Sequence, residues 1–201
     1  MAKRGSYAKG VAKRDEILTR ALDVVAEQGF RSASVREIAD AVGLSQAGLL
    51  HYFGTKEQLF VEILRKRDEV DLTRFEHETD SPDFIAEDYT ALVAHNAEVP
   101  GLVELFSRMS VEAADTAHPA HEYFLHRGDE VRTSFTAALR AQQDAGKLTD
   151  RVDAEALARI FQAVSDGMQL QWLVDRDVDM AAAVRALFDA LSTAPRPAER
   201  P

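Results

Sequence analysis

The sequence contains no cysteine, which excludes disulfide bonds and zinc sites built from thiolates. With only 6 prolines and 10 glycines among 201 residues, it is neither collagen-like nor a low-complexity chain. No uncharged apolar run reaches the about 18 residues of a membrane-spanning helix, and residues 1–10 carry charge without the apolar centre of a secretion signal. Because 46% of the residues are hydrophobic, the chain can bury a sizeable core. The lack of a membrane-spanning run and of a secretion signal leads us to expect a soluble cytoplasmic protein with no membrane partner.

Positive charge is also scarce: the net charge is −10, whereas domains that bind nucleic acid are usually basic. The charges are distributed unevenly, however. Residues 1–67 contain 12 Lys or Arg against 8 Asp or Glu, and residues 68–201 contain 12 against 26. Because screening acts over about 8 Å at physiological salt, a basic segment can contact DNA while distant acidic groups stay hidden from the phosphates.

Patterns typical of enzymes occur only as near misses. His121 and His126 resemble the two ligands of a zincin motif, but at five residues apart they lie about 140° apart around a helix instead of on one face. Residues 43–48 have the wrong spacing for a hydrolase nucleophile, and the sequence has no phosphate-binding glycine loop. We therefore predict no catalytic residue, no metal site and no cofactor.

Apolar residues recur at helical spacing along the whole chain, which predicts an all-α fold of about nine helices. Capping residues, glycines and prolines mark their expected ends. The predicted helices cover about residues 12–28, 34–43, 45–53, 56–78, 81–99, 101–118, 119–145, 153–174 and 180–193.

Two short amphipathic helices joined by a tight turn are predicted between residues 34 and 53. Ser34 and Glu37 form a Ser-x-x-Glu capping box, and Gly43 supplies the left-handed conformation that commonly ends a helix. A second helix begins after Ser45 and carries Leu49 on its inner face. This pattern is typical of a three-helix domain with a helix-turn-helix, in which the second helix of the motif enters the major groove of DNA.

Another capping box, Thr55 with Gln58, begins the next helix and places Lys56 at its positive end, which attracts phosphate. Gln46 is predicted to pair with an adenine edge, the alternative being an ordinary polar residue. Tyr52 and Lys56 are expected to contact phosphates, the alternatives being a half-buried ring and a solvated charge. The predicted DNA-binding residues are Ser34, Arg36, Ser45, Gln46, Ala47, Gly48, Leu50, His51, Tyr52, Thr55 and Lys56.

The start of the chain is basic, because five positive residues precede the first acid. They predict an arm that follows phosphates or enters the minor groove; a disordered basic tail is the alternative. The expected domains are a DNA-binding domain with this arm over residues 1–55, a helical effector-binding and dimerisation domain over 56–193, and a disordered tail over 194–201. The five positive residues that precede the first acid are Lys3, Arg4, Lys9, Lys13 and Arg14.

The segment from about Arg14 to Leu64 resembles the DNA-binding domain of the TetR family of bacterial transcription regulators. Leu50 and Gly48 stand where that family commonly has an aromatic residue and a Thr, Ser or Asn, so the base readout is expected to differ. The likeness rests on the order Ser45, Leu49, His51-Tyr52-Phe53, Thr55-Lys56-Glu57 and Leu59-Phe60.

The TetR resemblance implies a homodimeric repressor that a small-molecule effector releases from a palindromic double-stranded DNA operator. The residues by themselves leave one alternative, a helical small-molecule-binding protein or enzyme with a non-functional helix-turn-helix. Residues 166–180 resemble the corresponding part of the choline-responsive betaine regulators, which implies a similar dimer and pocket position without naming the ligand. Plain core is the alternative for each predicted pocket residue. Those residues are Tyr89, His95, Phe106, Met109, Glu112, Phe135, Met168 and Trp172.

The last two predicted helices carry apolar residues around much of their circumference, which favours a symmetric dimer packed as a four-helix bundle. The alternative is that both faces are internal core. Gly167 is unfavourable inside a helix by about 1 kcal/mol relative to alanine, which the close approach of another backbone would explain. The predicted interface residues are Phe161, Gly167, Val184, Leu187, Phe188 and Leu191.

Overall fold

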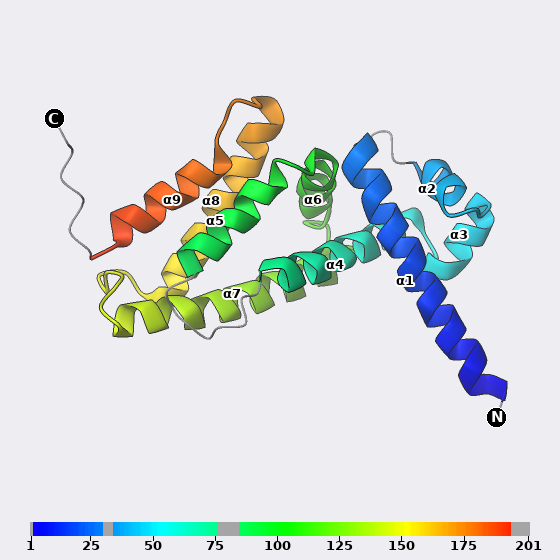
Figure 1. The fold of residues 1–201 in the computed structure, drawn as a ribbon, viewed down its shortest axis with the longest axis horizontal. Helices are drawn as coiled ribbons and strands as arrows, with labels where there is room; N and C mark the ends of the chain where they lie inside the picture. Colours follow the sequence, from blue (N-terminus) through cyan, green and yellow to red (C-terminus); the bar gives the residue numbers. More distant parts are fainter. Residues whose placement is uncertain (1, 30–33, 76–84, 194–201) are drawn as a thin grey trace. The chain divides into compact units, whose positions relative to one another are not determined.

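The computed structural model describes residues 2–29, 34–75 and 85–193, most of which are helical (Figure 1). In these segments β-pairing is limited to a bridge between Leu148 and Ser192, and none of the helices is long and apolar enough to cross a membrane. The all-α prediction is confirmed. The described helices are α1 (Ala2–Gln28), α2 (Val35–Ala41), α3 (Gln46–Phe53), α4 (Lys56–Phe75), α5 (Ile85–Asn96), α6 (Pro100–Glu112), α7 (His121–Asp144), α8 (Ala154–Val174) and α9 (Met180–Leu191).

The local signals in the sequence set most of the helix ends. Ser34 and Glu37 form the complete capping box of α2, in which each side chain bonds the other residue's backbone N–H. Gly43 has φ 68°, and Gly146 after α7 also has φ 68°, the left-handed region that favours glycine. Asp153 caps α8 by accepting hydrogen bonds from two backbone N–H groups. These interactions join residues a few positions apart, so the sequence predicts them well.

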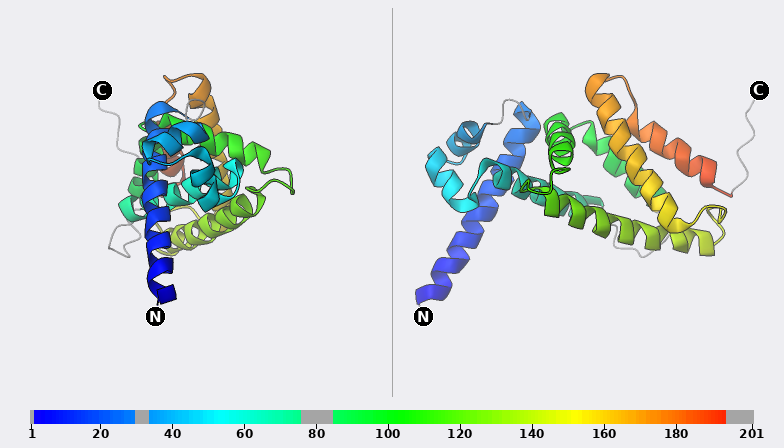
Figure 2. Two further views of the ribbon diagram at one scale, coloured as in Figure 1. Left: turned by 90° about the vertical axis from the view of Figure 1, so that its right-hand side faces the viewer. Right: turned by 180° about the vertical axis from the view of Figure 1, so that it is seen from behind.

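The prediction for the start of the first helix is wrong by ten residues, because α1 begins at Ala2 and not near residue 12. Residues 2–11 contain no proline. Gly5 and Gly10 each weaken a helix interior by about 1 kcal/mol relative to alanine, which does not end the helix here. Figure 2 shows the first turns of α1 extending past α2 and α3. The basic arm is therefore helical. The predicted start at Ser81-Pro82 and the predicted tail over 194–201 lie outside the described residues.

The chain divides into two compact units. Unit 1 consists of residues 1–74 and 96–125, and unit 2 consists of residues 75–95 and 126–201. This division by contacts differs from the boundary expected after residue 55, because α4 and α6 belong to the same unit as α1. The functional division, a DNA-binding part followed by an effector-binding part, stays a prediction.

Unit 1 has a continuous apolar core contributed by α1, α2, α3, α4 and α6. A close backbone contact lies where α6 begins against the end of α1. A Cβ atom added to Gly101 would collide with the carbonyl oxygen of Val25 and would lie 2.7 Å from Cα of Gly29. The same Val25 carbonyl accepts the hydrogen bond from Gly29 N that ends α1, at 3.1 Å. Only glycine at position 101 allows this approach.

Unit 2 is held together by a cluster of four aromatic rings. Tyr89 of α5 stacks on Phe135 of α7 with the ring centroids 4.6 Å apart, and Phe161 of α8 lies 4.3 Å from Phe188 of α9. Edge-on contacts connect the two pairs, the Phe135–Phe161 centroids being 5.4 Å apart. α8 and α9 follow each other through a short turn and pack together.

Candidate nucleic-acid interface

The helix-turn-helix is formed by α2 and α3 as the sequence predicts. Ile38 of α2 and both Leu49 and Phe53 of α3 are buried. The turn between the helices passes through Gly43, and α3 begins after Ser45, whose hydroxyl oxygen accepts a hydrogen bond from Gly48 N at 3.0 Å. The inner face of α3 is thereby fixed, and its outer face is left to solvent.

The outer face of α3 carries the residues predicted to read bases. Gln46, Ala47 and His51 are exposed, and Gly48 and Leu50 are half-buried. A Cβ atom on Gly48 would lie only 3.2 Å from the Ser45 hydroxyl oxygen, so a side chain at this position would crowd the hydroxyl that caps α3. The helix presents a narrow surface of small side chains with one amide and one imidazole. Their contacts with bases stay a prediction.

The predicted phosphate site lies at the start of α4. Thr55 N donates to the Gln58 side chain at 3.1 Å, and Gln58 N donates to the Thr55 hydroxyl at 3.1 Å, so the predicted capping box is confirmed. Lys56 is exposed, and its amino group lies 5.5 Å from the centre of the Phe60 ring. Tyr52 is half-buried. Since the first N–H groups of a helix lack intrahelical partners, the N-terminus of α4 suits an anion.

The residues predicted to contact the DNA backbone at α2 are also exposed. Arg36 lies 3.8 Å from Asp40 across one helical turn, a weak surface pair that phosphate can replace. The hydrogen bonds from Ser34 lower the pKa of Glu37 below its usual value, so the capping box keeps its charge at neutral pH. The Ser34 hydroxyl accepts a capping bond and still has a hydrogen to donate to phosphate.

Arg14 is used within unit 1, which corrects its assignment to a free basic arm. Its guanidinium lies 4.9 Å from the centre of the Phe53 ring and 3.0 Å from the Glu62 carboxylate. It also donates to the Tyr52 carbonyl oxygen at 3.4 Å. Arg14 thus joins α1 to the end of α3 and to α4. Its place three and four residues before the buried Ile17 and Leu18 is the sequence signal that could have indicated this role.

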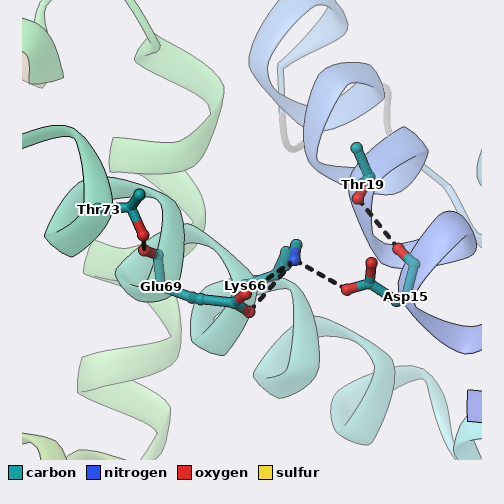
Figure 3. Close-up of polar contacts among 5 residues, drawn as sticks. All are labelled: Asp15, Thr19, Lys66, Glu69 and Thr73. Atoms are coloured by element: carbon teal, nitrogen blue, oxygen red, sulfur yellow. Dashed lines mark hydrogen bonds and ion pairs between the residues drawn. The ribbon is translucent and has the colours of Figure 1, made fainter. Parts of the chain in front are cut away.

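A second connection between α1 and α4 is made by Lys66 (Figure 3). Its amino group bonds Asp15 of α1 at 2.8 Å and Glu69 of α4 at 3.2 Å. The hydrogen bond to Asp15 is the main cause that raises the pKa of Lys66 above its usual value. Lys66 therefore stays charged at neutral pH and helps to fix α4, which carries Lys56, relative to α1. The sequence analysis missed this residue.

The eight predicted pocket residues do not form one group. Tyr89 and Phe135 stack in unit 2, where Met168 is half-buried and Trp172 is buried. Phe106 and Met109 instead belong to the core of unit 1, and their part in a pocket stays a prediction. The remaining two differ from both groups: Glu112 is exposed and lies 3.6 Å from His118, and His95 is half-buried.

The predicted interface residues divide into buried and accessible ones. Phe161 and Val184 are 0% exposed and Phe188 is 4% exposed within the single chain, so they cannot contact a partner and this part of the prediction is corrected. Leu187 and Leu191 are half-buried. Nothing lies within 4 Å of a Cβ placed on Gly167, so this residue does face outward. Helical periodicity showed two apolar faces on α8 without showing which one lies inside.

Comparison with known proteins agrees with this helix-turn-helix geometry. Residues 17–63 match the model of bacterial regulatory proteins of the tetR family. The chain is 32% identical over 108 residues to the HTH-type transcriptional repressor KstR2 of Rhodococcus jostii. The matched residues are 54% of this chain and 46% of that protein. It is 27% identical over 160 residues to KstR2 of Mycobacterium tuberculosis, covering 75% and 76% of the two chains.

A solved structure extends the likeness over nearly the whole fold. The crystal structure of a TetR transcription regulator from Haloarcula marismortui superposes with a TM-score of 0.75 at 23% identity, over 91% of this chain and 100% of the other. The fold of this chain is that of a helix-turn-helix protein with a helical C-terminal part. Over residues 17–63 the chain is similar to the tetR family of bacterial regulatory proteins, and over most of its length to a repressor and a regulator of that kind. It spans about half the length of the Rhodococcus jostii relative that it matches.

Proposed function

We propose that the protein is a homodimeric repressor that binds a palindromic DNA operator and is released from it by a small-molecule effector. The observation that carries the proposal is the exposure of Gln46, Ala47 and His51 on α3, followed along the chain by the exposed Lys56 at the start of α4. In this arrangement α3 enters the major groove. The N-termini of α4 and α2 contact phosphates on either side of the groove.

The first test concerns Lys56. Lys56→Ala is expected to weaken binding to all DNA sequences alike and to reduce the slope of log affinity against log salt by about one per phosphate contact, or two per dimer. Fluorescence anisotropy at several salt concentrations measures both effects. The control Arg185→Ala removes a charge from an exposed position of α9 and should leave the slope unchanged. An unchanged slope in Lys56→Ala would remove Lys56 from the phosphate contacts.

The contrasting substitution in the same assay is Gln46→Ala. If the amide pairs with a base edge, the loss is confined to one position in each half-site, at about 1 to 3 kcal/mol per contact. The salt slope should stay that of the parent protein, because no phosphate contact is removed. DNA selected by the variant should therefore differ from DNA selected by the parent at that position, and coinciding profiles would show that Gln46 reads no base.

A dimer surface is available on the outer face of α8. Its residues recur at alternating spacings of four and three, which is the period of a coiled-coil seam. They include Ile160, 42% exposed, Leu170, 51% exposed, and Val174, 90% exposed. We call this surface the α8 seam; it consists of Ala156, Ile160, Ala163, Gly167, Leu170 and Val174. The small residues among them permit the close approach of a second helix, which supports a dimer through this face.

Ile160→Glu is expected to give a folded monomer. The substitution puts a charge in the α8 seam, and because the side chain is exposed in the protomer, helicity should be kept. Operator affinity should fall strongly, since one reading head then binds without the second. Analytical ultracentrifugation, circular dichroism and operator binding measure the three quantities.

The control for this substitution is Ala141→Glu, at an exposed position of α7. This variant should sediment and bind the operator as the parent protein does. If the parent protein sediments as a monomer at micromolar concentration, the dimer proposal fails. If Ile160→Glu stays dimeric, the interface lies elsewhere than the α8 seam.

The effector is proposed to bind in unit 2, near Tyr89, Phe135, Met168 and Trp172. It lowers DNA affinity only by the ratio of its affinities for the DNA-free and DNA-bound conformations. In the described part of the chain, no group of His, Asp and Glu side chains is arranged to hold a metal ion. The alternative, a helical binding protein with an idle helix-turn-helix, predicts that the purified protein selects no sequence from a pool of random DNA fragments.

A further inference from the structure

The buried face of α8 changes from apolar to polar halfway along the helix. Leu157 and Phe161 lie on it first, Ser165 and Gln169 follow one and two turns later, and Trp172 ends it. Ser165 and Gln169 are each 7% exposed. In a core that served packing alone, apolar side chains would be expected at these two positions.

Only part of this buried polarity is satisfied within unit 2. The Tyr89 hydroxyl lies 2.9 Å from the Ser165 hydroxyl and 3.4 Å from the Phe161 carbonyl oxygen. One turn beyond Ser165, the side-chain oxygen Oε1 of Gln169 is buried and has no hydrogen-bond partner. A buried acceptor without a partner is rare in native proteins and calls for an explanation, of which a missing ligand is one.

The surroundings of Gln169 restrict the kind of ligand. One turn before Gln169, the Ser165 hydroxyl contacts Tyr89, which belongs to the aromatic cluster of Tyr89, Phe135, Phe161 and Phe188. Aromatic rings pack well against another ring. Among the described residues of unit 2, none of the buried side chains is charged. Burial also raises the pKa of Tyr89, so its hydroxyl is neutral at physiological pH. Such an interior disfavours an ionic ligand.

We propose that the interior of unit 2 binds an uncharged, mostly apolar ring compound whose hydroxyl group donates a hydrogen bond to Oε1 of Gln169. The Ser165 and Tyr89 hydroxyls orient the same group. Tyr89 and Phe135 are half-buried, so their stacked pair lies at the edge of the cluster. The role of this ligand as an effector rests on the proposed function, whereas its binding to unit 2 does not.

The test uses three probes with the same ring and the full-length protein. Cyclohexanol can donate a hydrogen bond, methylcyclohexane cannot, and cyclohexanecarboxylate is charged. The single tryptophan of the chain, Trp172, lies three residues from Gln169, so its fluorescence reports binding without a label. Saturable binding of cyclohexanol is expected to be about three- to tenfold tighter than that of either other probe, the factor that one net hydrogen bond supplies.

Gln169→Met separates a ligand-binding role from a structural one. Removing the unpartnered oxygen should leave Tm unchanged or raise it by about 2–4 °C, while the preference for cyclohexanol over methylcyclohexane disappears. Gln171→Met, at an exposed position two residues away, should keep both the Tm and the preference. A lower Tm for Gln169→Met with the preference unchanged would make Gln169 structural and overturn the proposal, as would equal binding of all three probes or tighter binding of the carboxylate.

Operator binding distinguishes this proposal from the function on which it rests. The unliganded Gln169→Met protein should bind operator DNA as the parent does. If the parent binds DNA but shows no saturable preference for cyclohexanol, the ligand proposal fails and the regulator remains. If it prefers cyclohexanol but selects no DNA, the ligand site stands and the repressor proposal fails.

Discussion

Phe161→Glu is expected to abolish the folded state of unit 2. The ring is 0% exposed and contacts the rings of Tyr89, Phe135 and Phe188. Truncating a buried phenylalanine costs about 3–5 kcal/mol, and burying an unpaired carboxylate adds several more. The total is comparable with the whole stability of a typical domain, about 5–15 kcal/mol. Circular dichroism should show a loss of helicity and a much lower, broadened thermal transition.

The neighbouring Ile160→Glu is the matched control for Phe161→Glu, because it introduces the same side chain one residue away on the outer face of α8. It should keep its helicity and thermal transition and change only the assembly. If Phe161→Glu also gave a folded helical monomer, Phe161 would face a partner chain and the packing of α8 within unit 2 would be contradicted.

Gly101→Ala is expected to destabilise unit 1 by about 3 kcal/mol, the upper part of the range for an overpacked core. The added methyl group would collide with the Val25 carbonyl and with the backbone of Gly29. Because backbone atoms lie on both sides of this contact, α6 must move away from α1. Tm should fall by roughly 6–12 °C. Operator affinity should fall as well, since α1 also packs against α2.

Gly128→Ala provides the control for Gly101→Ala, because it is also a glycine-to-alanine change within a helix. A Cβ at position 128 would meet only the side-chain nitrogen of Gln162, at 4.0 Å, an ordinary contact. Its expected effect is the opposite one, a gain of up to about 1 kcal/mol from helix propensity. Equal melting temperatures of the two variants would contradict the close approach of α6 to α1.

Much of the DNA-binding half could be predicted from the sequence, because its signals are short-range. The capping interactions of Ser34, Ser45 and Thr55 join residues three positions apart. They fix the ends of the helices whatever the rest of the chain does. The exposed position of Lys56 follows directly from the box that begins α4. The exposed face of α3 could be predicted in the same way, because Leu49 and Phe53 lie four residues apart and mark the buried face on the other side of the helix.

The pocket and interface residues depend on contacts between distant parts of the chain, and there the predictions were less successful. Phe106 and Met109 are apolar residues at helical spacing, and the sequence could not show that they pack in unit 1. Glu112 shares that helix and ends up exposed. Helices of similar amphipathic pattern can pack in many combinations, so the pattern identifies the apolar face without its partner.

The sequence by itself determined the helical class and the helix-turn-helix, because hydrogen bonds and apolar spacing within a few residues are enough to produce them. Only the tertiary structure decided that Phe161 lies inside and Ile160 outside, that Arg14 holds the end of α3, and that Gly101 is required by a crossing backbone. Each of these outcomes depends on residues about 30 or more positions away, and which of two apolar faces is buried is settled by the shape of the neighbours that pack against it.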